Sequence, residues 1–163
     1  LAGSSAASDV YKRQVIKPIH SYGGNDINLI SGKLNLLKIK QILKKHGHIM
    51  CQKFLNKIKF GDKRVFIING KVCGAISRVP KSGSILSNMS KGAKPKIAFL
   101  SNKELKVSNI IAKKIKKDGI YFAGIDFIDG KLNGDINVTS PTGIKTYFDL
   151  SQINLAKTFW KGL

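Results

Sequence analysis

The chain has 163 residues, of which 42% are hydrophobic, and it carries a formal net charge of +20 at pH 7. This composition excludes wholesale disorder and allows one domain with a hydrophobic core, or a piece of a larger protein. No apolar run approaches the ~20 residues that a membrane-spanning helix needs, so we expect no membrane association.

The positive charge is compatible with nucleic-acid binding, since Lys and Arg neutralise phosphates. Only Arg13, Arg64 and Arg78 are arginines, and the lysines are dispersed along the whole chain. Aromatic residues do not alternate with the basic ones, as a base-stacking platform requires. A basic RNA-binding module is therefore the alternative of another class, and not the leading hypothesis.

The two cysteines, Cys51 and Cys73, have no partners at the spacing of a zinc finger. We interpret them as reduced thiols in the core, which is typical of a cytoplasmic protein.

The first 14 residues differ from the rest of the chain. They begin with Leu, are small, polar and aperiodic, and contain no apolar run typical of a signal peptide. They resemble translated adapter or vector sequence. We expect residues 1–14 to be a tail outside the fold and residues 15–163 to form a partial domain of a protein that extends further upstream.

The first half of the chain predicts short strands and one amphipathic helix. Apolar runs predict strands over residues 15–19, 27–30 and 48–55, with a Gly-Gly loop at 20–26 and a helix over 33–46. The Asn69-Gly70 pair is a strong hairpin signal between strands at 64–70 and 71–79.

The second half opens with a long Gly/Ser/Lys loop over residues 81–96. A helix is predicted over 101–119, where Ser101 and Glu104 have the spacing of a capping box. Strands at 120–128 and 131–138 form a further hairpin, and the tail over 147–163 looks helical. Hairpin strands with helices on one face predict an α+β fold.

A candidate metal site lies in the last hairpin. Asp135 and Asn137 are two residues apart in a strand and so point to the same face, and the turn brings Asp126 of the preceding strand beside them. Carboxylate and amide oxygens suit Mg²⁺ or Mn²⁺ and not zinc. The alternative is a polar strand face in contact with solvent.

Three basic residues are candidates for binding an anionic ligand. Lys17 is the one charged residue in the predicted strand over residues 15–19, which is otherwise apolar. It precedes the Gly23-Gly24 loop, whose backbone N–H groups could bind phosphate. The alternative is an edge-strand lysine whose charged end reaches solvent. Arg64 and Arg78 lie on strands flanking one hairpin, and the guanidinium fork binds carboxylate or phosphate bidentately. They could equally be ordinary surface arginines.

Seven segments occur in order between residue 15 and about residue 145: VIKPIHSYGG, QKFL, GDKRV, SRVP, NMSKGAKPK, GIYFAGIDFI and DINVTSPTGI. Together they resemble the C-terminal ATP-grasp half of bacterial-type glutathione synthetase, and the combination of GDKR, GID and INVTSPT is specific within the ATP-grasp superfamily. The resemblance implies an ATP-grasp fold with antiparallel or mixed sheets, helices packed on one face, and the family's N-terminal domain missing.

The resemblance also implies a role for each candidate residue. ATP would be bound by Lys17, Gly23, Gly24, Gln52, Phe54, Leu55 and Asp62. The peptide substrate would be bound by Arg64, Asn88, Ser140, Pro141 and Thr142. Arg78 would be catalytic, and Asp126, Asp135 and Asn137 would hold Mg²⁺ or Mn²⁺.

The implied reaction joins γ-glutamylcysteine and glycine at the expense of ATP, through an acyl phosphate, and the family's homo-tetramers imply a homo-oligomer. The nearest alternative is another ATP-grasp carboxylate–amine ligase. The chain departs from the family pattern in having Asp135 where Glu is usual, a hairpin one residue longer after Asp126, His20 where Asp is usual, and SILSN in the loop over 81–96.

Overall fold

The computed structural model describes residues 13–20, 24–31, 36–84 and 86–162, apart from the side chains of residues 31 and 133–135. The chain divides into two compact units, which we call unit 1 (residues 1–56) and unit 2 (residues 57–163).

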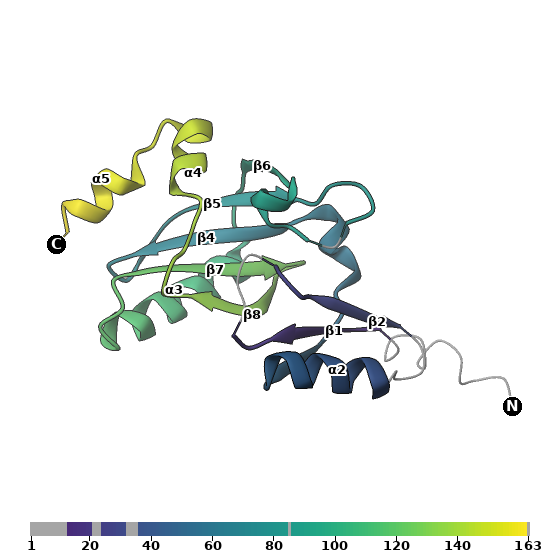
Figure 1. Ribbon diagram of the computed structural model, residues 1–163. Helices are drawn as coiled ribbons and strands as arrows, with labels where there is room; N and C mark the ends of the chain where they lie inside the picture. The colour runs from purple at the N-terminus through teal and green to yellow at the C-terminus, as the bar shows by residue number, and fades with distance from the viewer. Residues whose placement is uncertain (1–12, 21–23, 32–35, 85, 163) are drawn as a thin grey trace, which may run out of the picture. The chain divides into compact units, whose positions relative to one another are not determined.

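Unit 1 contains a three-stranded antiparallel sheet in the order β2-β1-β3, of which β1 and β2 are labelled beside helix α2 in Figure 1. Its strands are β1 (Arg13–Pro18), β2 (Asn28–Ser31) and β3 (Ile49–Lys53). Helix α2 (Leu36–His46) buries Ile42 against Ile16 and Ile30 of the sheet. Lys17 therefore lies in the central strand, so the interpretation as an edge-strand lysine is wrong.

Strand β1 begins two residues before the predicted start at Val15. The backbone of Arg13 pairs with Ser31, and Gln14 pairs with Ile30 on one side and Lys53 on the other. The sequence pattern missed this extension because strand pairing uses the backbone, whereas hydrophobic alternation only reports side chains.

Unit 2 contains a five-stranded antiparallel sheet in the order β6-β5-β4-β7-β8 (Figure 1). The strands are β4 (Asp62–Ile68), β5 (Lys71–Val79), β6 (Lys94–Ile97), β7 (Phe122–Ile128) and β8 (Lys131–Asn137). The predicted hairpin at Asn69-Gly70 joins β4 to β5, and both turn residues have positive φ. A short 3₁₀ helix, η1 (Asn56–Phe60), precedes β4.

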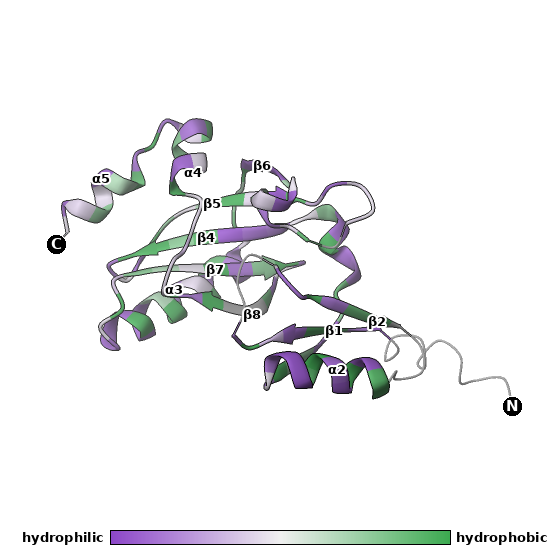
Figure 2. Ribbon diagram, viewed as in Figure 1, coloured by the Kyte–Doolittle hydropathy of each residue, from purple (hydrophilic) through white to green (hydrophobic). Residues whose placement is uncertain are grey.

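One face of this sheet packs on α3 (Asn102–Lys117). Ala112 and Ile115 of the helix join Val65, Ile67, Ile125 and other apolar strand residues in a buried core. Ser101 accepts a hydrogen bond from the backbone N–H of Glu104, and the Glu104 side chain binds the N–H of Ser101, so the predicted capping box is confirmed. Apolar and polar residues are interspersed along α3, as expected for a helix with one buried side (Figure 2).

The opposite face carries a second core at one end of the sheet. Phe66, Ile68 and Ile76 pack there with Tyr147 of α4 (Ile144–Ser151) and Leu155 of α5 (Leu155–Trp160). The strands and helices of the two units agree with the predicted α+β class. The prediction of helices on one face is wrong for unit 2, because α3 covers one face of its sheet and the two C-terminal helices cover part of the other. The other end of this face is polar.

Two local predictions need correction. The 81–96 segment is shorter as a loop than predicted, because it contains the 3₁₀ helix η2 (Met89–Lys91) and the beginning of β6. The helical tail begins at Ile144, three residues before the predicted start at 147, and Gln152, with a left-handed φ of 60°, ends α4 before α5 begins.

The two cysteines are free, but Cys51 is exposed and Cys73 is half-buried. Cys51 is therefore not a core residue. In the part of the chain that the structure describes, no helix has the length and apolar character needed to cross a membrane.

Candidate active site

The polar end of the unit 2 sheet holds four buried charged residues, Asp62, Arg64, Arg78 and Asp126, which we call the charged cluster. Successive residues of a strand point to opposite faces, so Asp62 and Arg64 share the face of Phe66 while Val65 points towards α3. Each of the four side chains belongs to a residue that is at most 7% exposed. The interpretation of Arg64 and Arg78 as ordinary surface arginines is therefore wrong.

Arg64 on β4 and Asp126 on β7 are directly opposite each other across the two strands. Arg64 Nε donates to Asp126 Oδ1 at 2.8 Å, and Arg64 Nη2 donates to Oδ2 at 2.7 Å. This is the bidentate arrangement in which the guanidinium fork matches both carboxylate oxygens. The orientation of Arg64 is thereby set by the sheet register.

Arg78 on β5 is bound by two carboxylates. Its Nε donates to Asp62 Oδ1 at 2.8 Å and its Nη2 donates to Asp62 Oδ2 at 2.5 Å. The same Nη2 lies 3.0 Å from Asp126 Oδ2. The four residues are therefore one connected network, in which two guanidinium groups balance two carboxylates.

Burial raises the pKa of Asp62 above its ordinary value, and this effect outweighs the hydrogen bond and the charge of Arg78. Burial acts in the same direction on Asp126, but the hydrogen bond from Arg64 and the charges of Arg78 and Arg64 lower the pKa of Asp126 overall. Burial would lower the pKa of Arg78, but Asp62 and Asp126 raise it. Arg78 therefore stays cationic, and the cost of burying each charge is offset by its partners.

The turn after β8 lies against this network. Arg64 Nη1 donates to Thr142 Oγ1 at 3.3 Å and to the Thr142 backbone oxygen at 3.4 Å. A Cβ atom added to Gly124 would lie 3.2 Å from Cβ of Pro141 and 3.5 Å from Arg64 Nε, so the absence of a side chain at Gly124 lets the turn approach the sheet. Of the predicted substrate-binding residues, Arg64, Pro141 and Thr142 thus lie together.

Ser140 and Asn88 have other contacts. The backbone N–H of Ser140 donates to Asn137 Oδ1 at 3.1 Å, which closes the start of the turn. Asn88 precedes η2, and its backbone oxygen accepts a hydrogen bond from the N–H of Lys91 at 2.9 Å.

Two of the predicted metal ligands, Asp126 and Asn137, offer oxygen donors on one face of the sheet. Asn137 pairs with Gly124, so it shares the face of Asp126 two residues further along β7. Among the described residues, Asp126 Oδ1 accepts one hydrogen bond and Asn137 Oδ1 accepts one, and each oxygen has a second lone pair. Two hard oxygen donors on one face fit Mg²⁺ or Mn²⁺.

Asp135 lies in β8, but its side chain is outside the described part of the structure. The pairing of the β7 and β8 backbones shows how the chain around Asp135 is arranged. Between the pairs Ile125–Ile136 and Phe127–Leu132, β7 has the single residue Asp126 while β8 has residues 133–135. The extra length noted in this hairpin is therefore accommodated as a bulge opposite Asp126. Among the His, Cys, Asp and Glu residues whose side chains are described, no group of three lies close enough together to hold a metal ion.

The predicted nucleotide-binding residues, apart from Asp62, belong to unit 1. Lys17 is in β1 and Gln52 in β3, Phe54 and Leu55 follow β3, and Gly24 has a φ of 75° in a turn. Gly23 lies outside the described residues. Phe54 packs its ring under the guanidinium of Arg13, with 5.2 Å between Arg13 Cζ and the ring centroid. Asp62 contacts Arg78 and Ser87, and its predicted contact with the nucleotide stays a prediction.

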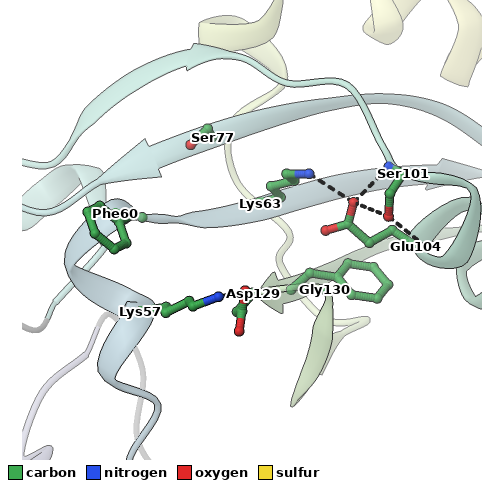
Figure 3. A pocket seen from close by; sticks show the side chains of 10 residues that line it. Lys57, Phe60, Lys63, Ser77, Ser101, Glu104, Asp129 and Gly130 are labelled. Atoms are coloured by element: carbon green, nitrogen blue, oxygen red, sulfur yellow. Dashed lines mark hydrogen bonds and ion pairs between the residues drawn. The ribbon is translucent and has the colours of Figure 1, made fainter.

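A separate hollow of about 560 Å³ lies on the α3 side of the same sheet (Figure 3). Lys63 Nζ is 2.8 Å from Glu104 Oε2, and Lys57 Nζ is 2.8 Å from Asp129 Oδ1. Burial would raise the pKa of Glu104, but hydrogen bonds from Lys63 and Ser101 lower it overall. These four charges are matched in pairs within the hollow, which is consistent with a role in stability.

Sequence reasoning missed Ser87, which donates from Oγ to Asp62 Oδ2 at 2.6 Å. Ser87 is one of four serines in the loop over residues 81–96, and no periodicity or motif singles it out. The pairing of Arg78 with Asp62 was also missed, because it depends on a bulge in the β4–β5 hairpin that the turn sequence does not signal.

The fold is similar to that of solved ligases. The crystal structure of D-cycloserine synthetase DcsG has a TM-score of 0.64 at 13% sequence identity, with 83% of this chain and 50% of that chain covered. The structure of the ATP-grasp ligase PsnB with its minimal precursor, Mg and ADP has a TM-score of 0.57 at 17% identity, with 91% and 45% covered. At such identities the likeness establishes the ATP-grasp fold alone.

Sequence similarity establishes the family. Glutathione synthetase from Synechocystis sp. is 34% identical over 146 residues, and that from Prochlorococcus marinus subsp. pastoris is 36% identical over 140 residues. These alignments cover 88% and 84% of this chain, which spans about 45% of the length of each relative. The family profile described as "Prokaryotic glutathione synthetase, ATP-grasp domain" matches residues 5–152, and the chain therefore belongs to that family.

Proposed function

We propose that the chain is the ATP-grasp part of a ligase that makes glutathione from γ-glutamylcysteine and glycine. The observation that carries the proposal is the charged cluster: two buried arginines, oriented by two carboxylates, lie beside the Pro141-Thr142 turn in a chain of the glutathione synthetase family. Such preorganised cations stabilise negative charge that develops during phosphoryl and acyl transfer.

In the proposed reaction, the γ-phosphoryl group of ATP moves to the free carboxylate of γ-glutamylcysteine, which gives an acyl phosphate and ADP. The amine of glycine then attacks the acyl carbon, phosphate leaves, and the amine loses a proton. Arg78 stabilises charge on the transferring phosphoryl group and on the oxyanion, and loss of such a contact typically costs about 3–4 kcal/mol of barrier.

Arg64 and the Ser140-Pro141-Thr142 turn would bind the peptide substrate, together with Asn88. The contacts of Arg64 support this assignment, because its Nη1 already reaches Thr142 while Nε and Nη2 are held by Asp126. A guanidinium fixed on one edge presents its other edge in a defined direction, which favours bidentate binding of a substrate carboxylate.

For the nucleotide, we propose contacts from Lys17, Gly23 and Gly24 to phosphates, from Gln52, Phe54 and Leu55 to adenine, and from Asp62. Mg²⁺ or Mn²⁺ held by Asp126, Asp135 and Asn137 would neutralise charge on the phosphate oxygens. We also propose a cytoplasmic location and a homo-oligomeric assembly of the complete enzyme.

The first test is the binding of Mg-ATP by the full 163-residue chain, measured as thermal stabilisation. Ligand at 100 times its Kd adds about 2.7 kcal/mol, which corresponds to roughly 5–10 °C in Tm for a chain of this size. Asp135→Asn should reduce this shift, whereas Asp129→Asn, at an exposed carboxylate in a surface ion pair, should leave it unchanged. Equal shifts in all three proteins would remove Asp135 from the site.

A second test separates glutathione synthesis from other ATP-grasp ligations. In an enzyme completed with the upstream sequence of a relative, glycine should stimulate ADP release in the presence of γ-glutamylcysteine, and glutamate should not. Stimulation by glutamate alone would point to a different carboxylate–amine ligase. Stabilisation of the chain by a short RNA, with no response to Mg-ATP, would refute the ligase proposal.

A further inference from the structure

Ser87 connects the loop after β5 to the charged cluster. Its hydroxyl donates to Asp62 Oδ2 at 2.6 Å, a short distance typical of a hydroxyl bound to a carboxylate. Asp62 is 3% exposed, so this hydrogen bond reaches an oxygen that has little access to solvent. The loop residue therefore completes the surroundings of a buried carboxylate.

Asp62 in turn determines how Arg78 is oriented. Both oxygens of Asp62 accept hydrogen bonds from Arg78, one from Nε and one from Nη2. Within the described residues, the hydrogen bonds of Arg78 use these two nitrogens and leave Nη1 to donate to a ligand oxygen. Rotation of the Asp62 carboxylate would rotate the guanidinium plane and redirect Nη1.

We propose that Asp62 and Ser87 are positioning residues for Arg78, with the Ser87 hydroxyl locking the carboxylate that aims the guanidinium. The catalytic importance of that aim rests on the proposed function. Ser87 lies in the loop that precedes η2, so the conformation of this loop determines whether Arg78 is aimed. The orientation of Arg78 thus depends on Ser87, a residue 9 positions further along the chain. The direct contacts of Arg64 do not include this loop.

Arg64 provides the contrast within the same molecule. It is held by Asp126 on a neighbouring strand and by Thr142 in the turn after β8, and neither contact involves the loop of Ser87. Removal of the Ser87 hydroxyl should therefore loosen Arg78 and leave Arg64 in place. General loosening of the fold would affect both.

The small number of arginines makes it possible to measure the mobility of each guanidinium group separately. Because Arg13, Arg64 and Arg78 are the three arginines of the sequence, an ¹⁵N–¹H spectrum of the full chain contains three Nε–H signals. They can be assigned by Arg→Lys substitution one at a time. The quantity to measure is the rate at which each Nε–H exchanges with solvent.

In Ser87→Ala, exchange of the Arg78 Nε–H should become about tenfold faster, the size expected for losing one charge-assisted hydrogen bond. The Arg64 rate should stay within twofold. Ser87→Thr keeps a hydroxyl and should restore the wild-type rate at Arg78. Ser90→Ala, at an exposed serine of the same segment, is the matched control and should change neither rate.

An unchanged Arg78 rate in Ser87→Ala would overturn the proposal, and so would equal acceleration at Arg64 and Arg78. Failure of this positioning proposal is distinguishable from failure of the proposed function, because the exchange rates are measured without nucleotide. If the exchange pattern is as expected and the wild-type chain is stabilised by RNA but not by Mg-ATP, the ligase proposal fails while the positioning of Arg78 by Ser87 stands.

Discussion

Arg64 and Asp126 face each other across strands β4 and β7 and are joined by two parallel hydrogen bonds of 2.8 and 2.7 Å. Asp126 also contacts Arg78, so one carboxylate connects three strands of the sheet. Because all of these groups are buried, the network contributes to stability as well as to the proposed chemistry.

Asp126→Asn should lower the free energy of unfolding by about 3–5 kcal/mol, since removing one partner leaves buried guanidinium groups without compensation. Urea unfolding of the full chain measures this loss. Asp129→Asn is the matched control, because Asp129 forms an exposed ion pair with Lys57 that should contribute less than about 1 kcal/mol. Equal losses in the two variants would contradict the assigned role of Asp126.

Gly74→Ala should destabilise the chain by about 1–3 kcal/mol through overpacking. A Cβ atom at this position would lie 2.5 Å from Cζ of Tyr147, the buried ring that attaches α4 to the sheet. Thermal unfolding of Gly74→Ala, Tyr147→Leu and the double variant forms a cycle that isolates the contact. If the two substitutions are additive, the clash is relieved elsewhere and the explanation is wrong.

The stability of the chain should fall with acid partly through Glu104. The pKa of Glu104 is below its ordinary value of 4.5 in the folded protein, so its contribution is present above about pH 4.5 and is lost as the pH falls through the folded pKa. Glu104→Gln should lower the free energy of unfolding at pH 7 by about 1–3 kcal/mol, and the difference from wild type should shrink towards pH 3. A difference independent of pH would contradict this.

Removal of divalent metal should abolish most of the stabilisation by ATP. The triphosphate would then approach the carboxylates of Asp126 and Asp135 without a cation between them, and like charges at close range repel each other. The thermal shift produced by ATP in EDTA should fall to a small fraction of that with Mg²⁺, and added Mn²⁺ should restore it. An unchanged shift in EDTA would place the nucleotide away from these acids.

Much of the secondary structure follows from local sequence. The Ser101–Glu104 capping box, the Asn69-Gly70 turn and strand β5 lie where the pattern predicts them, because each depends on interactions within a few residues. The candidate residues on the unit 2 sheet are also recognisable in the sequence, since arginine is rare in this lysine-rich chain and an acid and an amide two residues apart share one face of a strand.

The partners of those residues were decided by register. Continuing the pairing Ile68–Lys71 without interruption would place Asp62 opposite Ser77 and turn Arg78 to the α3 face. The shift between Phe66 and Ile67 instead pairs Asp62 with Arg78, because one extra residue in β5 moves every later side chain to the other face. A second bulge places residues 133–135 opposite Asp126.

The sequence alone thus determined the family resemblance, the class of fold and the residue types that phosphoryl transfer would require, since these depend on composition, motif and local pattern. Only the tertiary structure decided that Asp62 holds Arg78, that Asp126 joins both arginines, and that Ser87 reaches them from a loop. The physical reason is that strand register and loop path arise from packing of the whole sheet, which no short segment encodes.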